Sequence, residues 1–170
     1  MAEGAAPAER TRTVEWENPM IGAGMAREMS GIEYLRGIRD GVIPPPPIAM
    51  TLGFLLDVIE EGRVSFAVDP AEYHYNPIGV VHGGVAATLC DSAMGSAVHT
   101  LLPPGTGYTS VDLAIKFLRP VTLQTGRIRA EASVLHLGSR TALAEARLTD
   151  AAGKLLAHAT STCLILRADG

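Results

Sequence analysis

The sequence has little of several residue types on which common protein classes depend. Its 170 residues include two cysteines, 5% aromatic residues and 19% charged residues. Cys90 and Cys163 are too few for a disulfide framework, and no His or Cys residues have the spacing of a zinc site. Because both lie among apolar residues, we expect them to be reduced and buried. No metal and no cofactor is predicted.

Long apolar runs are also lacking. None approaches the ~20 residues that a helix needs to cross a bilayer. The first residues, MAEGAAPAERTRT, have no apolar segment like that of a signal peptide. A net charge of −4 gives no general attraction to nucleic acids or anionic membranes. We therefore expect a cytoplasmic protein that binds neither nucleic acid nor membrane.

The chain does contain enough apolar material for one sizeable core. Hydrophobic residues make up 47% of it, and chains of ~100–200 residues usually form one domain. We predict a flexible tail over residues 1–13, a helical extension with a proline linker over residues 14–50, and the main domain over residues 51–168.

Two sequence patterns predict the structure of the N-terminal extension. Ser30 followed by Glu33 is typical of a capping box, which predicts an amphipathic helix from about Ser30 to Asp40, and Gly41 is suited to end it. Pro44 to Pro47 predict a stiff, extended spacer, because proline fixes φ and donates no backbone hydrogen bond.

The stretch Gly83 to Val98, GGVAATLCDSAMGSAV, predicts the helix around which the main domain is built. Its apolar residues fall on every side, which is typical of a helix buried inside a core. Asp91 is the single formal charge in its middle. A lone carboxylate in such surroundings costs several kcal/mol unless it is paired, solvated or neutralised.

The rest of the main domain is rich in predicted strands joined by short turns. Such strands pair antiparallel, so the sequence predicts an α+β fold in which one sheet curls around one helix. In the strand after the helix, alternate apolar residues predict a buried face. The predicted strands are Phe54–Glu60, Arg63–Val68, Ser110–Leu118, Arg127–Leu137, Arg140–Thr149 and Lys154–Leu166.

Five residues near the central helix have side chains or amides suited to chemistry. Asn76 lies in the preceding loop, and His82 and Gly83 begin the helix. The N–H groups of a first helical turn have no partner within the helix and can bind a developing oxyanion. Asp91 lies just over two turns further on. Ser110, which we expect to open the next strand, can share a water with a carboxylate.

Most of these residues also have an ordinary structural interpretation. His82 suits a hydrogen-bonded structural histidine, Gly83 suits close helix–sheet packing, and Asn76 before a proline suits a turn. Ser110 alone is uninformative. Asp91 is different, because its neighbours one turn away, Thr88, Ala87, Met94 and Gly95, include no cation.

The run HYNPIGVVHGGVAATLCDSAMGSAV, residues 74–98, resembles the signature of the PaaI-type acyl-CoA thioesterases. These belong to the hot-dog superfamily, which includes the 4-hydroxybenzoyl-CoA thioesterases. The resemblance continues through TSVDLAIKFLRPV (109–121) and the closing AAGKLLAHATSTCLI, and so covers about residues 53–166. It implies an antiparallel sheet wrapped around one long helix.

The resemblance also implies roles for the five residues. Asp91 would be the general base on water or the nucleophile, and the Gly83 amide would polarise the thioester carbonyl. Asn76 and His82 would orient the substrate, and Ser110 would help Asp91 hold the water. One subunit would supply Asn76, His82 and Gly83 and its partner Asp91 and Ser110, so the enzyme would be at least a homodimer and commonly a homotetramer.

The substrate would be an acyl-CoA, so its CoA phosphates need protein partners. Arg119 and the turn containing His136, Gly138, Ser139 and Arg140 are our candidates, since arginine and backbone N–H groups bind phosphate. An ordinary β-turn with a solvated arginine explains the same residues. Two other functions stay open: a hot-dog hydratase or dehydratase, and a non-catalytic acyl-CoA-binding module.

Overall fold

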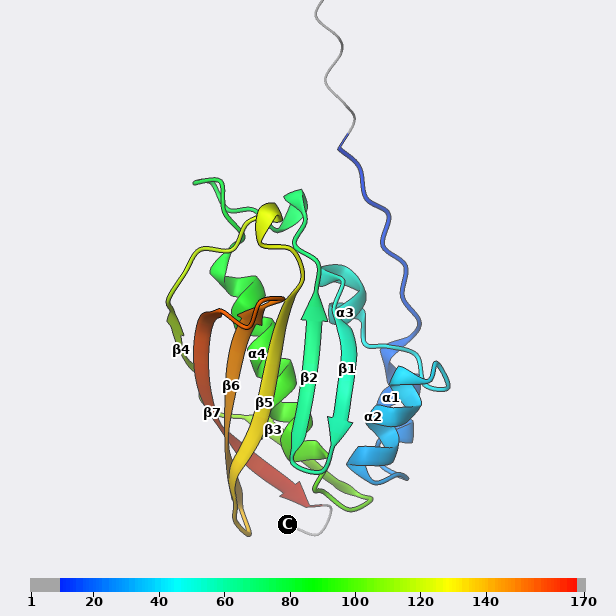
Figure 1. Cartoon of the computed structure of the whole chain (residues 1–170). Helices are drawn as coiled ribbons and strands as arrows, with labels where there is room; N and C mark the ends of the chain where they lie inside the picture. Colours follow the sequence, from blue (N-terminus) through cyan, green and yellow to red (C-terminus); the bar gives the residue numbers. More distant parts are fainter. Residues whose placement is uncertain (1–9, 168–170) are drawn as a thin grey trace, which may run out of the picture.

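A computed structural model describes residues 10–167, which form one antiparallel sheet around a single long helix (Figure 1). The seven-stranded sheet has the order β1-β2-β5-β6-β7-β3, and β4 also pairs with β7. The helices are α1 (Pro19–Met25), α2 (Gly31–Arg39), α3 (Pro47–Leu52) and α4 (Gly83–His99), with short 3₁₀ turns η1 (Glu72–His74) and η2 (Leu123–Thr125). The strands are β1 (Leu55–Glu60), β2 (Arg63–Val68), β3 (Thr106–Ser110), β4 (Ala114–Phe117), β5 (Ile128–Leu137), β6 (Thr141–Asp150) and β7 (Leu155–Arg167).

The core lies between α4 and the inner face of the sheet. In β5 and β6 the inward residues are mostly alanines, among them Ala130, Ala132, Ala144 and Ala146, each with no exposed surface. Small side chains let the helix approach the sheet closely, and larger residues such as Leu89 fill the spaces between them. The predicted α+β architecture, with a sheet curled around one apolar helix, is confirmed.

The predicted strand Ser110–Leu118 is wrong in one respect, because it is interrupted. Ser110 ends β3 instead of opening a strand, and the chain resumes pairing only at Ala114. The Asp112 side chain causes the break: its Oδ1 accepts the Thr162 N–H at 2.9 Å. The bulge turns Val111 outward, which leaves it 59% exposed instead of in the core.

The N-terminal extension covers β1 and one side of α4 (Figure 1). Its capping box is confirmed: the Ser30 N–H and Oγ both donate to Glu33 Oε2, at 3.1 and 2.5 Å. Gly31 is needed where α2 meets the end of α4, since a Cβ there would lie 1.8 Å from the His99 carbonyl oxygen.

The proline linker is shorter than predicted. Pro47 begins α3, because proline is well tolerated at the first position of a helix. Helix α1, which no sequence pattern predicts, begins in the same way at Pro19 after Asn18. Within the predicted tail, residues 1–9 lie outside the described residues, whereas Arg12 lies over the ring of Tyr73 at 4.0 Å.

Candidate active site

The start of α4 presents one free backbone N–H. The His82 Nδ1 atom accepts the Gly84 N–H at 2.8 Å, and the His82 carbonyl accepts the Val85 N–H at 2.9 Å. Among the described residues, no acceptor meets the Gly83 N–H. This amide lies at the positive end of the helix dipole, so it is suited to hold an oxygen that gains negative charge.

The loop before α4 is fixed by Asn76. Its Oδ1 accepts the N–H groups of Ile78 at 3.1 Å and of Val80 at 3.2 Å, which folds the loop back on itself. The His82 N–H then donates to the His74 carbonyl at 2.8 Å. The Asn76 oxygen therefore organises the loop, and only its amide NH₂ remains for a ligand.

A cavity of about 450 Å³ brings this end of the site together. Asn76, His82 and Gly83 line it, and Arg119 lies on the same wall, where Nη1 donates to the Leu155 carbonyl. Phe117 also lines it, and its ring lies so close that a Cβ on Gly83 would be 3.0 Å from Phe117 Cζ. The alternating apolar pattern of this strand predicts that Phe117 is buried in the core, but its side chain is 57% exposed and its ring lies beside Gly83.

Asp91 and Ser110 form a second group of polar residues, two turns along α4. The Ser110 Oγ donates to Asp91 Oδ1 at 2.8 Å, and both residues are half-buried. None of the ion pairs among residues 10–167 includes Asp91. The carboxylate therefore keeps an oxygen free to accept a proton.

The neighbouring cysteine does not compete with Asp91 as a reactive group. Burial, with a smaller effect from the Asp91 charge, raises the pKa of Cys90 to about 12. The thiol is therefore protonated near neutral pH, and a protonated buried thiol is a poor nucleophile. Cys163 is also buried and free.

The two groups do not meet within one chain. Gly83 and Asp91 are eight residues apart on one straight helix, which separates them by about 12 Å along its axis. A reacting carbonyl must lie within about 3 Å of both the amide and the attacking water, so this distance is too long for one copy.

The residues predicted to bind the CoA phosphates also lie in two separate places. Arg119 lies near the start of α4, whereas the turn of residues 138–140 joins β5 to β6 at the opposite end of the molecule (Figure 1), and His136, predicted to lie in that turn, is instead paired within β5. The Arg140 carbonyl accepts the Ile165 N–H at 2.9 Å, and Ile165 pairs with Tyr108 of β3, the strand that carries Ser110. Arg140 therefore lies level with Tyr108 along β7, with β7 between it and the strand that carries Ser110.

One detail of that turn differs from the prediction. The Gly138 N–H donates to the Thr141 carbonyl at 2.8 Å, which closes the hairpin. It is therefore not available to a phosphate, whereas the Arg140 guanidinium has no ion pair among the residues described. Across residues 10–167, no group of three or more His, Cys, Asp or Glu residues is placed to hold a metal ion. No helix in that range is long and apolar enough to cross a membrane.

Comparison with known proteins identifies the family. Residues 78–157 match the model of the thioesterase superfamily. Acyl-coenzyme A thioesterase 13 of Homo sapiens is 35% identical over 102 residues, which cover 59% of this chain and 71% of the relative. The 1,4-dihydroxy-2-naphthoyl-CoA hydrolase of Listeria monocytogenes is 25% identical over 115 residues, which cover 68% of this chain and 92% of the relative.

A solved structure agrees with these likenesses. The phenylacetic acid degradation-related protein of Ralstonia eutropha superimposes with a TM-score of 0.70 at 28% identity, over 77% of this chain and 98% of that one. The family match lies in the part of the chain that contains α4, Asp91 and Ser110, whereas α1, α2 and α3 precede it. The chain belongs to the thioesterase superfamily, and it is a thioesterase of the hot-dog fold.

Proposed function

We propose that this protein hydrolyses acyl-CoA thioesters to a free acid and CoA, with Asp91 as the general base. The observation that carries the proposal is the Asp91 carboxylate, which is half-buried, is held by the Ser110 hydroxyl at 2.8 Å and has no ion pair within residues 10–167. Such a group costs folding free energy, so it is expected where chemistry needs it. The acyl-CoA thioesterase and the CoA-thioester hydrolase among the relatives support the substrate class.

In the proposed reaction, Asp91 takes a proton from water while the water oxygen attacks the thioester carbonyl carbon. The carbonyl oxygen becomes an oxyanion that accepts the Gly83 N–H. The tetrahedral intermediate then collapses, the C–S bond breaks, and CoA leaves as a thiolate that is protonated by solvent or by Asp91. Asn76 and His82 position the thioester beside Gly83, and Ser110 holds the Asp91 carboxylate.

This mechanism requires two copies of the chain, since one copy cannot bring Gly83 to Asp91. The open edge formed by β3 and β4 is the surface we propose for the contact, because both strands pair with β7 on one side only. Large apolar side chains are exposed along it, with Val111 at 59%, Phe117 at 57% and Leu118 at 51%. An unpaired apolar edge of this kind is typical of a surface that a second chain covers.

The same two-copy arrangement gives the CoA phosphates two cationic partners. Arg119 would come from the copy that supplies Gly83, and Arg140 from the copy that supplies Asp91. Ser139, in the same turn as Arg140, and His136, near the end of β5, would lie beside the nucleotide. The homotetramer expected from the family resemblance stays a prediction, which light scattering of the purified protein checks.

Phenylacetyl-, benzoyl- and medium-chain acyl-CoA are the first substrates to test, by following the release of free thiol. Replacing Asp91→Asn is expected to lower kcat by ~10²-fold or more, the range of general acid–base catalysis. Asp57→Asn is the matched control, because Asp57 is an exposed carboxylate paired with Arg129.

Three outcomes would overturn the proposal. Near-normal turnover by the Asp91→Asn variant would show that Asp91 is not the general base. Addition of water to an enoyl-CoA without thiol release would favour the hydratase. Tight binding of acyl-CoA without turnover across the whole panel would favour the binding module.

A further inference from the structure

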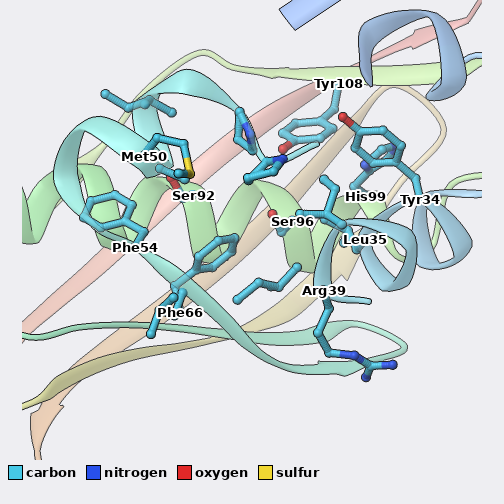
Figure 2. A pocket seen from close by; sticks show the side chains of 17 residues that line it. Tyr34, Leu35, Arg39, Met50, Phe54, Phe66, Ser92, Ser96, His99 and Tyr108 are labelled. Carbon is cyan, nitrogen blue, oxygen red and sulfur yellow. The ribbon is translucent and has the colours of Figure 1, made fainter. Parts of the chain in front are cut away.

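A second cavity, of about 380 Å³, lies between α4 and the N-terminal extension (Figure 2). Its walls are largely apolar and come from α2, α3 and the first two strands, with Leu35, Ala49, Met50, Phe54 and Phe66 among them. Apart from α4 and β3, which form its floor, the residues that line it precede the segment matched by the family. The cavity is therefore built largely by the part of the chain that the family match leaves out.

One end of this cavity lies next to the proposed catalytic carboxylate. Ser92, the residue after Asp91 on α4, lines this end of the cavity. Tyr108 lies flat against α4 because residue 95 is glycine: a Cβ there would be 2.5 Å from Tyr108 Cε2. The cavity therefore begins one residue beyond Asp91 on α4 and continues along that helix past Ser96 to His99.

Three rings close the other end. The His99 ring centroid lies 5.5 Å from that of Tyr34 and 5.5 Å from that of Tyr108 (Figure 2). His99 is only 8% exposed, and burial lowers its pKa, so its imidazole is uncharged near neutral pH. An uncharged ring can form the end of an apolar cavity without the cost of a buried charge.

Beyond these rings lies a different, more open hollow of about 740 Å³. His99 and Tyr108 line both spaces, and the hollow also contains Gly105 and Arg167. The rings of His99 and Tyr108 are thus a wall between a narrow apolar cavity and an open space. Removing the His99 ring would join the two.

We propose that the cavity holds the acyl group of the substrate, and that the wall of Tyr34, His99 and Tyr108 limits that group to medium length. This inference rests on the proposed thioesterase function of Asp91. His99 is eight residues beyond Asp91 on one helix, about 12 Å along its axis, and we take this separation as the length available to the acyl group. An unbranched medium-chain acyl group or a single aromatic ring fits that length, whereas a long chain would collide with the His99 ring.

The test is the dependence of kcat/KM on acyl length, from butyryl-CoA to palmitoyl-CoA. For the wild-type protein, each added methylene is expected to raise kcat/KM about fourfold until the chain reaches the wall, after which kcat/KM falls. His99→Ala opens the wall and is expected to raise kcat/KM for palmitoyl-CoA at least tenfold relative to butyryl-CoA. Ala49→Leu narrows the cavity and is expected to move the optimum to shorter chains.

His158→Ala is the matched control, because His158 lies away from the cavity, paired with Glu145. Thermal unfolding checks that each variant is folded, and Tyr34→Ala replaces His99→Ala if the latter does not fold. Equal length profiles in the wild type, His99→Ala and Ala49→Leu would overturn the inference, and so would a wild-type preference for palmitoyl-CoA.

A second readout separates this inference from the proposed function. Calorimetry with non-hydrolysable thioether analogues of the same acyl-CoAs measures the length dependence of Kd without turnover. If the wild type hydrolyses nothing but its Kd still follows the predicted profile and shifts in His99→Ala, the thioesterase proposal fails and the cavity assignment stands. A Kd that does not change with acyl-chain length would overturn the cavity assignment even in an active enzyme.

Discussion

Replacing Gly83→Pro would remove the N–H that we assign to the oxyanion without moving the backbone. Gly83 is the first residue of α4, where proline is tolerated and its missing N–H breaks no helical hydrogen bond. His82, the residue before it, has φ −61° and ψ 133°, which is the extended conformation that a following proline requires. Loss of one oxyanion donor typically costs ~10²–10³ in kcat, or about 3–4 kcal/mol.

Gly83→Ala is the control that separates the hydrogen bond from the added bulk. Both variants place a Cβ about 3.0 Å from the Phe117 ring, so both displace that ring by a similar amount. Only the proline variant lacks the donor. We expect kcat for a good acyl-CoA substrate, followed by thiol release, to be at least 10²-fold lower in Gly83→Pro than in Gly83→Ala. Equal kcat values in the two variants, both folded by thermal unfolding, would refute the assignment of this amide.

Two further predictions concern the carboxylate and the stability of the fold. Ser110→Ala removes the hydrogen bond to Asp91 and is expected to lower kcat about 10- to 150-fold, the equivalent of ~1.5–3 kcal/mol for a hydrogen bond to a charged group; unchanged kcat would show that the hydroxyl has no part in the reaction. Burial lowers the pKa of both His74 and His99, so the folded protein takes up these protons at lower pH than the unfolded chain, whose histidines titrate near pH ~6.5. The free energy of unfolding should therefore be fully retained above that pH and should fall as the pH drops below it; urea titrations that show no slope between about pH 5 and 6.5 would contradict this.

The fold was predictable where the pattern of apolar residues is local. α4 reads as a buried helix because its small and apolar residues cover all sides, and β5 and β6 read as strands joined by a short turn at Gly138. The capping box of α2 likewise depends on only four consecutive residues. Each of these elements depends on neighbours in the sequence, so each was expected close to its observed bounds.

The predictions are wrong where contacts between distant residues, or the several roles of proline, determine the local structure. The break between β3 and β4 depends on the bond from the Thr162 N–H to Asp112, fifty residues earlier, which no local pattern reveals. Pro47 resembled part of a rigid spacer, yet the same residue type suits the first turn of a helix. The acyl cavity also escaped prediction, because it forms only when the extension folds onto α4.

The candidate site shows the same division between local and distant information. Asp91 could be singled out from the sequence because a charge in an apolar helix has few structural explanations. The prediction for Ser110 is a water shared with the Asp91 carboxylate, whereas the structure shows a direct hydrogen bond between the two side chains. The Phe117 ring over Gly83 could not be foreseen, since the turn at Asp112 sets which side of β4 faces the helix.

The central claim, that each active site joins Gly83 of one copy to Asp91 of another, is tested most directly by mixing two inactive variants. Asp91→Asn and Gly83→Pro are unfolded together, refolded as a one-to-one mixture, and assayed for thiol release. In a symmetric dimer, half of the molecules are mixed and one of their two sites is intact, so about a quarter of wild-type activity should return. A mixture no more active than the separately refolded variants would contradict the claim and place both groups in the same copy.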